Sequence, residues 1–486
     1  MRQTIKGYPM LIGYLGYFMM MMGLILLLPL IIMIFYPEEQ SFAYAWIIPG
    51  VLCLVIGYLL TLILKGREPL KLERHQDAIL LLLIWIIAIF VSAFPIYLLG
   101  GYTFTQSIFE ATSGYSTTGL SIVDVASASK TLLFYRSLMQ FFGGVGLVLV
   151  LTSTLSDRYG IRLYTAEGHN DKVLPNLAKS ARLILSLYTI YIVIGTMGYV
   201  MFGMSWFDAI NHSTGSLSTG GFSTQVESIG HYQSAPIEWI TIILMLLGST
   251  NFIVHLWLLK GKLRMGIHHI EVQLFLVLTP IVIIVMWYAL SVASYPHALR
   301  IAIFQYVSAI TTTGFQTIPT FQSLPPLFIF SVIMMMIIGG QAGSTSGGIK
   351  QFRIGLMLKG MYWSIRDRIS HQRTIHAHDI YKFGKRLQVQ DNDLHATHAF
   401  IMLYLMVLVI GTLIFTSYGY TLEESIFEFS SSLGTVGLSI GIIGPQTPSP
   451  LLWTSILGMI LGRLEFYVVI IACSTLFIKS FKKKVL

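Results

Sequence analysis

The chain has 486 residues, of which 55% are hydrophobic and 11% are charged, and its mean hydropathy is +0.72. A soluble domain carries about 25% charged residues, so this composition excludes an ordinary soluble protein and predicts a membrane protein. The net charge of +9 does not indicate nucleic-acid binding, because the basic residues lie in short groups between apolar runs. The two cysteines, Cys53 and Cys473, both lie within apolar runs and indicate no disulfide framework.

Two apolar runs, residues 10–35 and 43–64, come first. Each has the roughly 20 apolar residues that a helix needs to cross a bilayer. The first run is too long for the apolar region of a secretory signal and lacks a small-residue cleavage site, so we expect it to stay in the protein. Residues 1–70 are therefore predicted to form two transmembrane helices.

From residue 71 onward, the chain repeats one pattern four times. Each repeat has a spanning run, a short run of about 12 residues, a stretch rich in Gly, Ser and Thr, and a second spanning run. We place the repeats at residues 71–158, 159–262, 263–390 and 391–486. The predicted fold is an all-α integral membrane protein in which four M1–P-loop–M2 repeats surround one pore with pseudo-fourfold symmetry.

The short runs cannot cross the bilayer, so we expect each to be a re-entrant half-helix that enters from the outer side. Non-helical backbone must follow them at membrane depth, which is tolerated where it lines water or is buried in protein. The four segments read FTQSIFEATSGYSTTGLS (104–121), WFDAINHSTGSLSTGGFST (206–224), LRIAIFQYVSAITTTGFQT (299–317) and LEESIFEFSSSLGTVGLS (422–439).

The four segments predict a filter for a monovalent cation. The C-terminus of each half-helix carries about half a negative charge, and backbone carbonyls after it can replace the hydration shell of an ion. Small residues also serve helix packing, but four aligned triplets argue against that alternative. The predicted filter residues are Thr117, Thr118, Gly119, Ser218, Thr219, Gly220, Thr312, Thr313, Gly314, Thr435, Val436 and Gly437. We place the ion at Thr118, Gly119, Thr219, Gly220, Thr313, Gly314, Val436 and Gly437.

The third repeat differs from the others, because its second run is interrupted by GGQAGSTSGGIK at residues 339–350. This string lacks the ending of a Walker A motif and lies in a membrane helix. We expect an unwound gating loop (residues 339–348) below the filter, since glycine-rich backbone changes shape easily. A static kink is the alternative. The predicted gating residues are Gly339, Gly340, Gly343, Ser344, Thr345, Gly347, Gly348, Lys350 and Arg463.

Two charged residues near this loop carry open alternatives. Arg463 lies within the apolar run at residues 453–478, where a charge is costly and usually marks function. It is expected to act as an electrostatic barrier or as a partner of the gating loop, unless it forms a structural pair with Glu465. Lys350 is nearer the inner side, so its amine could instead reach the interface.

The basic residues also predict the orientation. Of the 31 lysines and arginines, 27 lie in the two tails or in alternate connections between the runs, while the other connections are acidic. This distribution obeys the positive-inside rule with both termini in the cytoplasm, as expected for a multi-pass protein of the cytoplasmic (inner) membrane.

Enzymatic function is not indicated. The histidines near residues 371–398 have no recognised metal-ligand spacing, and the HSTGS string at residues 212–216 lacks the form of a nucleophile elbow. We therefore predict that the chain is not an enzyme.

Several strings resemble the Trk/Ktr/HKT superfamily of potassium transporters. They are FEATSGYSTTGLS, SLSTGGFST, TTTGF, SLGTVGLS, IIGGQAGSTSGGIK, LYTAEG at residues 163–168 and LGRLEF, and they cover nearly the whole chain. The string at residues 337–350 is specific to this superfamily, whereas a lone TTG is not. The two additional N-terminal helices resemble the longer bacterial potassium-uptake members.

The resemblance implies potassium as the transported ion, no prosthetic group and a homodimer of pores in the lipid bilayer. It also implies a cytoplasmic, nucleotide-binding TrkA-like regulatory partner. Filter glycines are implied at Gly119, Gly220, Gly314 and Gly437, a combination that accompanies potassium preference in the family. Sodium-selective or sodium-coupled transport by the same fold, and an ion-binding subunit of an ATP-driven pump, are the alternative functions.

Overall fold

The computed structural model describes residues 3–5, 7–69, 75–147, 177–371, 376–382 and 384–484. Within them, six helices are long and apolar enough to cross a membrane, or seven if one bent pair counts as a single span. The all-α prediction is confirmed, apart from two short strand pairs. The strand pairs are β1 (Gln3–Ile5) with β2 (Arg67–Pro69), and β3 (Asp379–Lys382) with β4 (Lys385–Gln388). The expected boundary at residues 158 and 159 and the LYTAEG string lie outside the described ranges.

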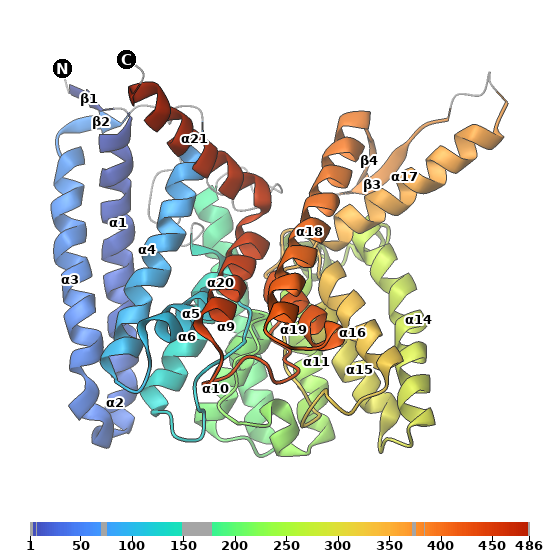
Figure 1. The fold of residues 1–486 in the computed structure, drawn as a ribbon, viewed down its shortest axis with the longest axis horizontal. Helices are drawn as coiled ribbons and strands as arrows, with labels where there is room; N and C mark the ends of the chain where they lie inside the picture. The colour runs from blue at the N-terminus through green and yellow to red at the C-terminus, as the bar shows by residue number, and fades with distance from the viewer. Residues whose placement is uncertain are drawn as a thin grey trace.

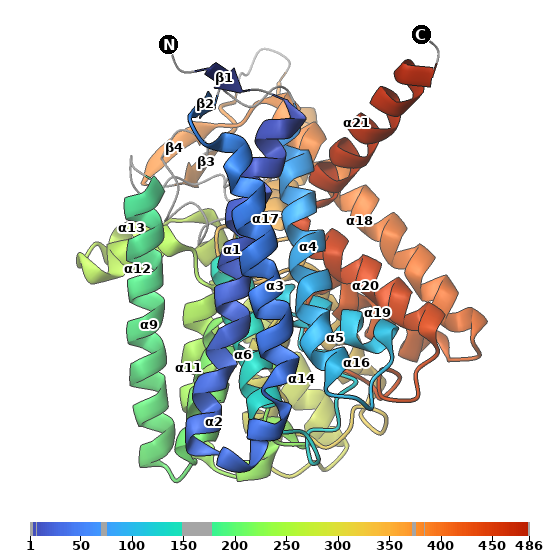
Figure 2. The same ribbon diagram turned by 90° about the vertical axis from the view of Figure 1, so that its left-hand side faces the viewer.

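The N-terminal hairpin confirms the two predicted helices and lies beside the first repeat (Figure 2). Its helices approach closely, because a Cβ on Gly16 would lie only 2.8 Å from the carbonyl oxygen of Gly57. Glu39 in the connection accepts hydrogen bonds from the backbone N–H groups of Lys130 and Thr131, at 2.6 and 2.8 Å. The elements are α1 (Tyr8–Leu27), η1 (Leu28–Ile31), α2 (Ile32–Phe35), η2 (Pro37–Phe42), α3 (Tyr44–Thr61) and η3 (Leu62–Leu64).

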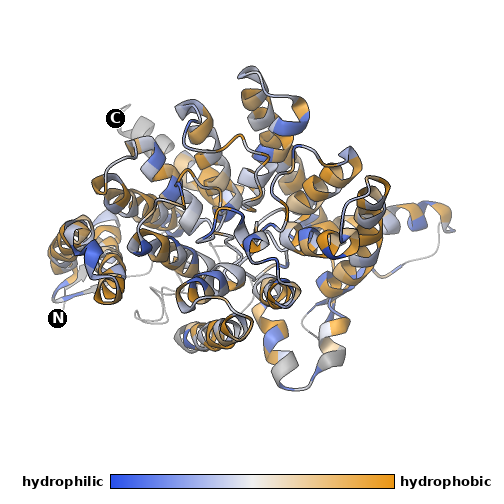
Figure 3. Cartoon of the chain, turned by 90° about the horizontal axis from the view of Figure 1, so that it is seen from below, coloured by the Kyte–Doolittle hydropathy of each residue, from blue (hydrophilic) through white to orange (hydrophobic). Residues whose placement is uncertain are grey.

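Helices surround a centre where non-helical segments meet (Figure 3). β1 and the last helix end on the same side of the molecule (Figure 1). Repeat 1 contains α4 (Gln76–Leu98), α5 (Phe104–Tyr115) and α6 (Lys130–Val145). Repeat 2 contains α9 (Leu177–Met201), α10 (Trp206–Leu217), η4 (Ser228–Tyr232), α11 (Ala235–Ser249) and α12 (Phe252–Leu259). Repeat 3 contains α13 (Leu263–Ile267), α14 (Ile270–Val292), α15 (Ala298–Ile310), α16 (Pro326–Ile338) and α17 (Gln351–Ile369). Repeat 4 contains α18 (Asp391–Ser417), α19 (Leu422–Gly434), α20 (Ser449–Leu464) and α21 (Phe466–Lys484).

The pore helices α5, α10, α15 and α19 are the predicted half-helices, and they have only 12 or 13 residues each. Three of them begin at a Ser or Thr whose hydroxyl accepts a hydrogen bond from a backbone N–H of the first turn. These capping residues are Thr103, Ser205 and Thr421. The caps determine where these three short helices start, and therefore how far their C-termini reach into the protein.

The second helices of repeats 2, 3 and 4 are interrupted, whereas the sequence predicted an interruption only in repeat 3. Gly146 (φ 100°) follows α6, Gly339 (φ 71°) follows α16, and Glu465 (φ 60°) follows α20. In repeat 2, the break lies between α11 and α12. The expectation of one continuous span over residues 453–478 is wrong, because α20 and α21 are bent by 105°. Arg463 therefore lies at the end of a helix rather than in the middle of one.

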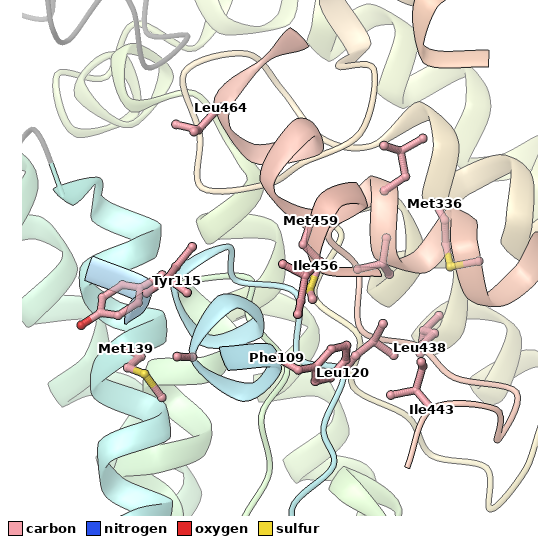
Figure 4. Close-up of a cluster of buried hydrophobic side chains, with 14 of the residues drawn as sticks. Phe109, Tyr115, Leu120, Met139, Met336, Leu438, Ile443, Ile456, Met459 and Leu464 are labelled. Atoms are coloured by element: carbon pink, nitrogen blue, oxygen red, sulfur yellow. The ribbon is translucent and has the colours of Figure 1, made fainter. Parts of the chain in front are cut away.

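Buried apolar side chains join the first and last repeats and close the ring. Helix α5 packs directly against α20. Figure 4 shows Phe109 and Leu120 of repeat 1 beside Ile456, Met459 and Leu438 of repeat 4, all in one buried cluster. On the outer surface, in contrast, long apolar side chains such as Ile281 and Ile284 of α14 are more than half exposed. A surface of that kind is suited to lipid.

Candidate ion-conduction site

Each pore helix is followed by a threonine in a left-handed backbone conformation. A non-glycine residue in this region costs about 1–3 kcal/mol, so the surrounding structure must impose it. The hydroxyls of Thr117 and Thr219 donate to the preceding carbonyl oxygens, at 2.7 and 2.8 Å. The φ angles of Thr117, Thr219, Thr312 and Thr435 are 55°, 51°, 54° and 51°. This shared, unusual geometry identifies the corresponding positions of the four repeats.

Two residues beyond each threonine lies a glycine with positive φ. The angles of Gly119, Gly221, Gly314 and Gly437 are 91°, 72°, 88° and 97°. These four glycines line one cavity of about 590 Å³, which we call the vestibule. Gly220 does not line this cavity and does not have a positive φ.

The predicted register of the second repeat is therefore wrong by one residue. The triplet that corresponds to Thr117–Gly119 is Thr219–Gly221, so the placement of Ser218, Thr219 and Gly220 moves forward by one position. Two adjacent glycines in STGGF allowed either alignment. The apolar residue after the glycine was the missed signal, because Leu120, Phe222, Phe315 and Leu438 are all buried.

The four glycines also show how the repeats meet. A Cβ on any one of them would overlap a backbone carbonyl oxygen of the next repeat. The glycine–carbonyl pairs are Gly119 with Gly220, Gly221 with Thr313, Gly314 with Val436, and Gly437 with Thr118. These contacts run from repeat 1 to 2, 3, 4 and back to 1. They close a ring that brings together the predicted filter residues of all four repeats.

A polar side chain nine residues before each glycine supports the backbone beyond it. Glu110 accepts a hydrogen bond from Ser121 Oγ at 2.9 Å, and Glu428 accepts one from Ser439 Oγ at 2.7 Å. In repeat 2, Nε2 of His212 lies 2.9 Å from Oγ of Ser223. Repeat 3 has Gln305 at this position. The same spacing to Gly221 in repeat 2 supports the corrected register.

Arg136 was not among the predicted site residues, although it is buried beside the vestibule. Its Nε donates to Oε1 of Glu110 at 2.7 Å, and its other nitrogens donate to Oγ of Ser121 and to the carbonyl of Ser223. Its guanidinium also lies 4.0 Å from the ring centre of Phe222. This residue therefore connects the filter segments of repeats 1 and 2. The sequence signal that could have identified Arg136 was its position, because it is one of the few basic residues outside the expected inner connections.

Arg136→Met is expected to lower the free energy of unfolding by about 3–5 kcal/mol, because it leaves the carboxylate of Glu110 buried without its partner. Thermal unfolding of the purified protein in detergent measures the change. Adding Glu110→Gln should restore part of the loss, since repeat 3 has glutamine at this position. Arg366→Met is the control, because both side chains of the Arg366–Asp367 pair are partly exposed. Equal losses at both arginines would contradict the prediction.

The gating loop lies directly against the threonines that follow the pore helices. Oγ1 of Thr219 donates to Oγ1 of Thr345 at 3.0 Å, and the N–H of Gly347 donates to Oγ1 of Thr312 at 2.8 Å. A Cβ on Gly347 would overlap the side-chain oxygen of Thr435. The loop thus contacts three of the four repeats immediately beyond the filter segments.

Cationic side chains hold the loop from its other side. Arg463 donates to the carbonyl oxygen of Thr345, and it donates to the carbonyls of Gly143 and Gly144 at 2.5 and 3.3 Å. Nζ of Lys350 donates to the carbonyl of Ser346. Glu465, the other partner considered for Arg463, instead accepts from Nη2 of Arg353 with both of its carboxylate oxygens, each at 2.9 Å.

The space beyond the loop is small. A cavity of only about 20 Å³ is lined by Gly343, Ser346, Gly347, Lys350, Arg463 and Glu465, among others. One water molecule needs roughly 10–15 Å³, so this cavity has room for hardly more than one. The vestibule, the ring of four filter segments and the glycine-rich loop are therefore direct neighbours, because the ring glycines line the vestibule and the loop contacts the threonines of the ring.

The fold and this site define a membrane pore protein built from four re-entrant repeats. The family model described as TrkH, a cation transport protein, matches residues 47–481. An uncharacterized cation transporter of Methanocaldococcus jannaschii is 30% identical over 99% of this chain and 98% of its own. The potassium uptake protein TrkH of Escherichia coli K12 is 30% identical over 83% of this chain and 86% of its own.

The solved structure of the potassium transporter TrkH from Vibrio parahaemolyticus has the same fold. It superposes with a TM-score of 0.83 at 24% identity and covers 96% of this chain and 98% of its own. The chain belongs to the TrkH family of cation transport proteins. This confirms the resemblance to the Trk/Ktr/HKT superfamily and the prediction that the chain is not an enzyme.

Proposed function

We propose that the chain takes up potassium through the ring of filter segments, with the membrane potential as the driving force. The observation that carries the proposal is the closed ring in which each filter glycine faces a carbonyl of the next repeat. Backbone carbonyls at such positions can replace the water around a dehydrated cation. Relatives named as potassium uptake proteins support potassium as that cation.

The vestibule receives the ion from outside, and the gating loop closes the path beyond the filter. A negative interior contributes about 2.3 kcal/mol per charge for each 100 mV, which is sufficient for accumulation without a second ion. The C-termini of the pore helices carry partial negative charge from the helix dipoles, which further stabilises a cation in the filter. We further propose an inner-membrane location with cytoplasmic termini, a homodimer, and a TrkA-like regulator on the inner face.

Ion competition in proteoliposomes tests the proposal. External potassium should suppress the uptake of a rubidium tracer at a concentration about tenfold or more lower than the sodium concentration that gives the same suppression. The reason is that the carbonyl ring replaces the hydration shell of potassium, the larger ion, at a lower free-energy cost than that of sodium. Liposomes without protein and the Gly221→Ser variant are the controls. Equal competition by sodium would overturn potassium selectivity. Uptake that requires a sodium gradient would overturn transport driven by potential alone.

A further inference from the structure

Four consecutive residues at the junction of α13 and α14 connect the gating loop with the β3–β4 hairpin. Residues 268–271 read His-His-Ile-Glu, and they follow α13 directly. The hairpin extends from the body of the protein together with α17 (Figure 1). The segment thus lies between a projecting element and the occluded pore.

On the hairpin side, the contacts are aromatic and apolar. The ring of His268 lies 5.7 Å from the ring of Tyr381 in β3. Ile270 is 3% exposed and belongs to a small buried cluster with Leu356, Trp363, Ile380 and Val389. This cluster is separate from the main core, so it binds α14, α17 and the hairpin into one local unit.

On the pore side, the contact is a buried carboxylate. Glu271 is fully buried, and its Oε1 accepts a hydrogen bond from the N–H of Ala342 in the gating loop at 2.6 Å. Nδ1 of His269 lies 3.5 Å from Oε2 of Glu271. Asn251 holds the carbonyl of the same loop residue, because its Nδ2 donates to the oxygen of Ala342 at 2.5 Å. A hydrogen bond to a charged, buried acceptor is roughly twice as strong as a neutral one.

We propose that Glu271 is a positioning residue that holds the gating loop against the filter, and that the β3–β4 hairpin controls this hold through Ile270 and His268. The proposal rests on the gating function proposed above for residues 339–348. Movement of the hairpin would shift Ile270, and Glu271 is the next residue in the same helix. The displaced carboxylate would then release the N–H of Ala342, and the loop would lose its attachment on the repeat 3 side.

Rubidium flux through the purified full-length protein in liposomes, without any partner, tests the hold. Glu271→Ala should raise basal flux about tenfold, because a charge-assisted hydrogen bond that favours the closed state is lost. Glu271→Gln keeps an acceptor for Ala342 and should stay within about threefold of the unaltered protein. Deletion of residues 340–347 should raise flux by itself.

A double substitution separates positioning from general damage. In the loop-deleted protein, Glu271→Ala should cause no further change in flux, because the loop backbone that Glu271 holds has been removed. A further change in that background, or unchanged flux after Glu271→Ala alone, would overturn the role of Glu271. If the loop deletion itself fails to raise flux, the proposed gating function fails instead, so the two failures are distinguishable.

The coupling to the hairpin has its own matched pair of variants. Ile380→Ala removes a side chain from the cluster around Ile270 and should raise basal flux, as Glu271→Ala does. In the Glu271→Ala protein, Ile380→Ala should cause no further increase in flux. Arg386→Ala, on the exposed strand β4, should leave basal flux unchanged. Additive effects of Ile380→Ala and Glu271→Ala, or equal effects of Ile380→Ala and Arg386→Ala, would overturn the coupling.

Discussion

Gly221→Ser is expected to lower the ratio of potassium to sodium permeability by about tenfold or more. The new Cβ would overlap the carbonyl oxygen of Thr313, and φ of 72° is strained for serine, so the filter segments of repeats 2 and 3 must move apart. A displacement of even a fraction of an ångström changes the distances at which carbonyls coordinate an ion. Bi-ionic flux measurements in liposomes give the ratio.

Gly220→Ser is the matched control, one residue away. Its Cβ would meet the side-chain amide of Gln140, which can rotate, and Gly220 has no positive φ. Gln140 donates to the carbonyl of Gly220 at 2.5 Å, so some loss is expected, but within about threefold. A larger effect at Gly220 than at Gly221 would contradict the corrected register.

Arg463→Ala should raise basal flux by about tenfold or more, because it removes both a positive charge from the proposed ion path and the donors that hold Thr345 in the proposed gating loop. Arg463→Lys should give an intermediate flux, since lysine keeps the charge without the planar fork of donors. Tracer efflux from liposomes measures both variants.

Arg353→Ala is the control for this prediction. It breaks the nearby pair with Glu465, which is about one-fifth exposed, without touching the loop carbonyls held by Arg463. If Arg353→Ala opens the path as much as Arg463→Ala, the effect comes from the helix break at Glu465. If Arg463→Ala leaves flux unchanged or reduces it, the static-kink interpretation of residues 339–348 is favoured.

Much of the fold was predictable, because its determinants are local. Runs of about 20 apolar residues identify spans, and runs of about 12 residues that end in Gly, Ser and Thr identify half-helices. The repeat pattern then orders them around one centre. The breaks in the second helices of repeats 2 and 4 were missed, since Glu465 and the Ser249–Asn251 region are not rich in glycine and the interruption depends on tertiary contacts.

The site was predicted at the level of segments rather than contacts. The register of repeat 2 was ambiguous because Gly220 and Gly221 are adjacent, and only backbone angles and the facing carbonyl distinguish them. Arg136 and Glu271 act through partners distant in sequence, Ser223 and Ala342. Periodicity and composition contain no information about such pairs.

The four supporting residues at corresponding positions differ: Glu110, His212, Gln305 and Glu428. Such variety is impossible in a channel assembled from four identical subunits, where one codon change alters all four subunits together. When one gene encodes all four repeats, a mutation can change one repeat while the other three stay intact. Evolution could thus adjust ion preference in small steps, each carried by a pore that still works.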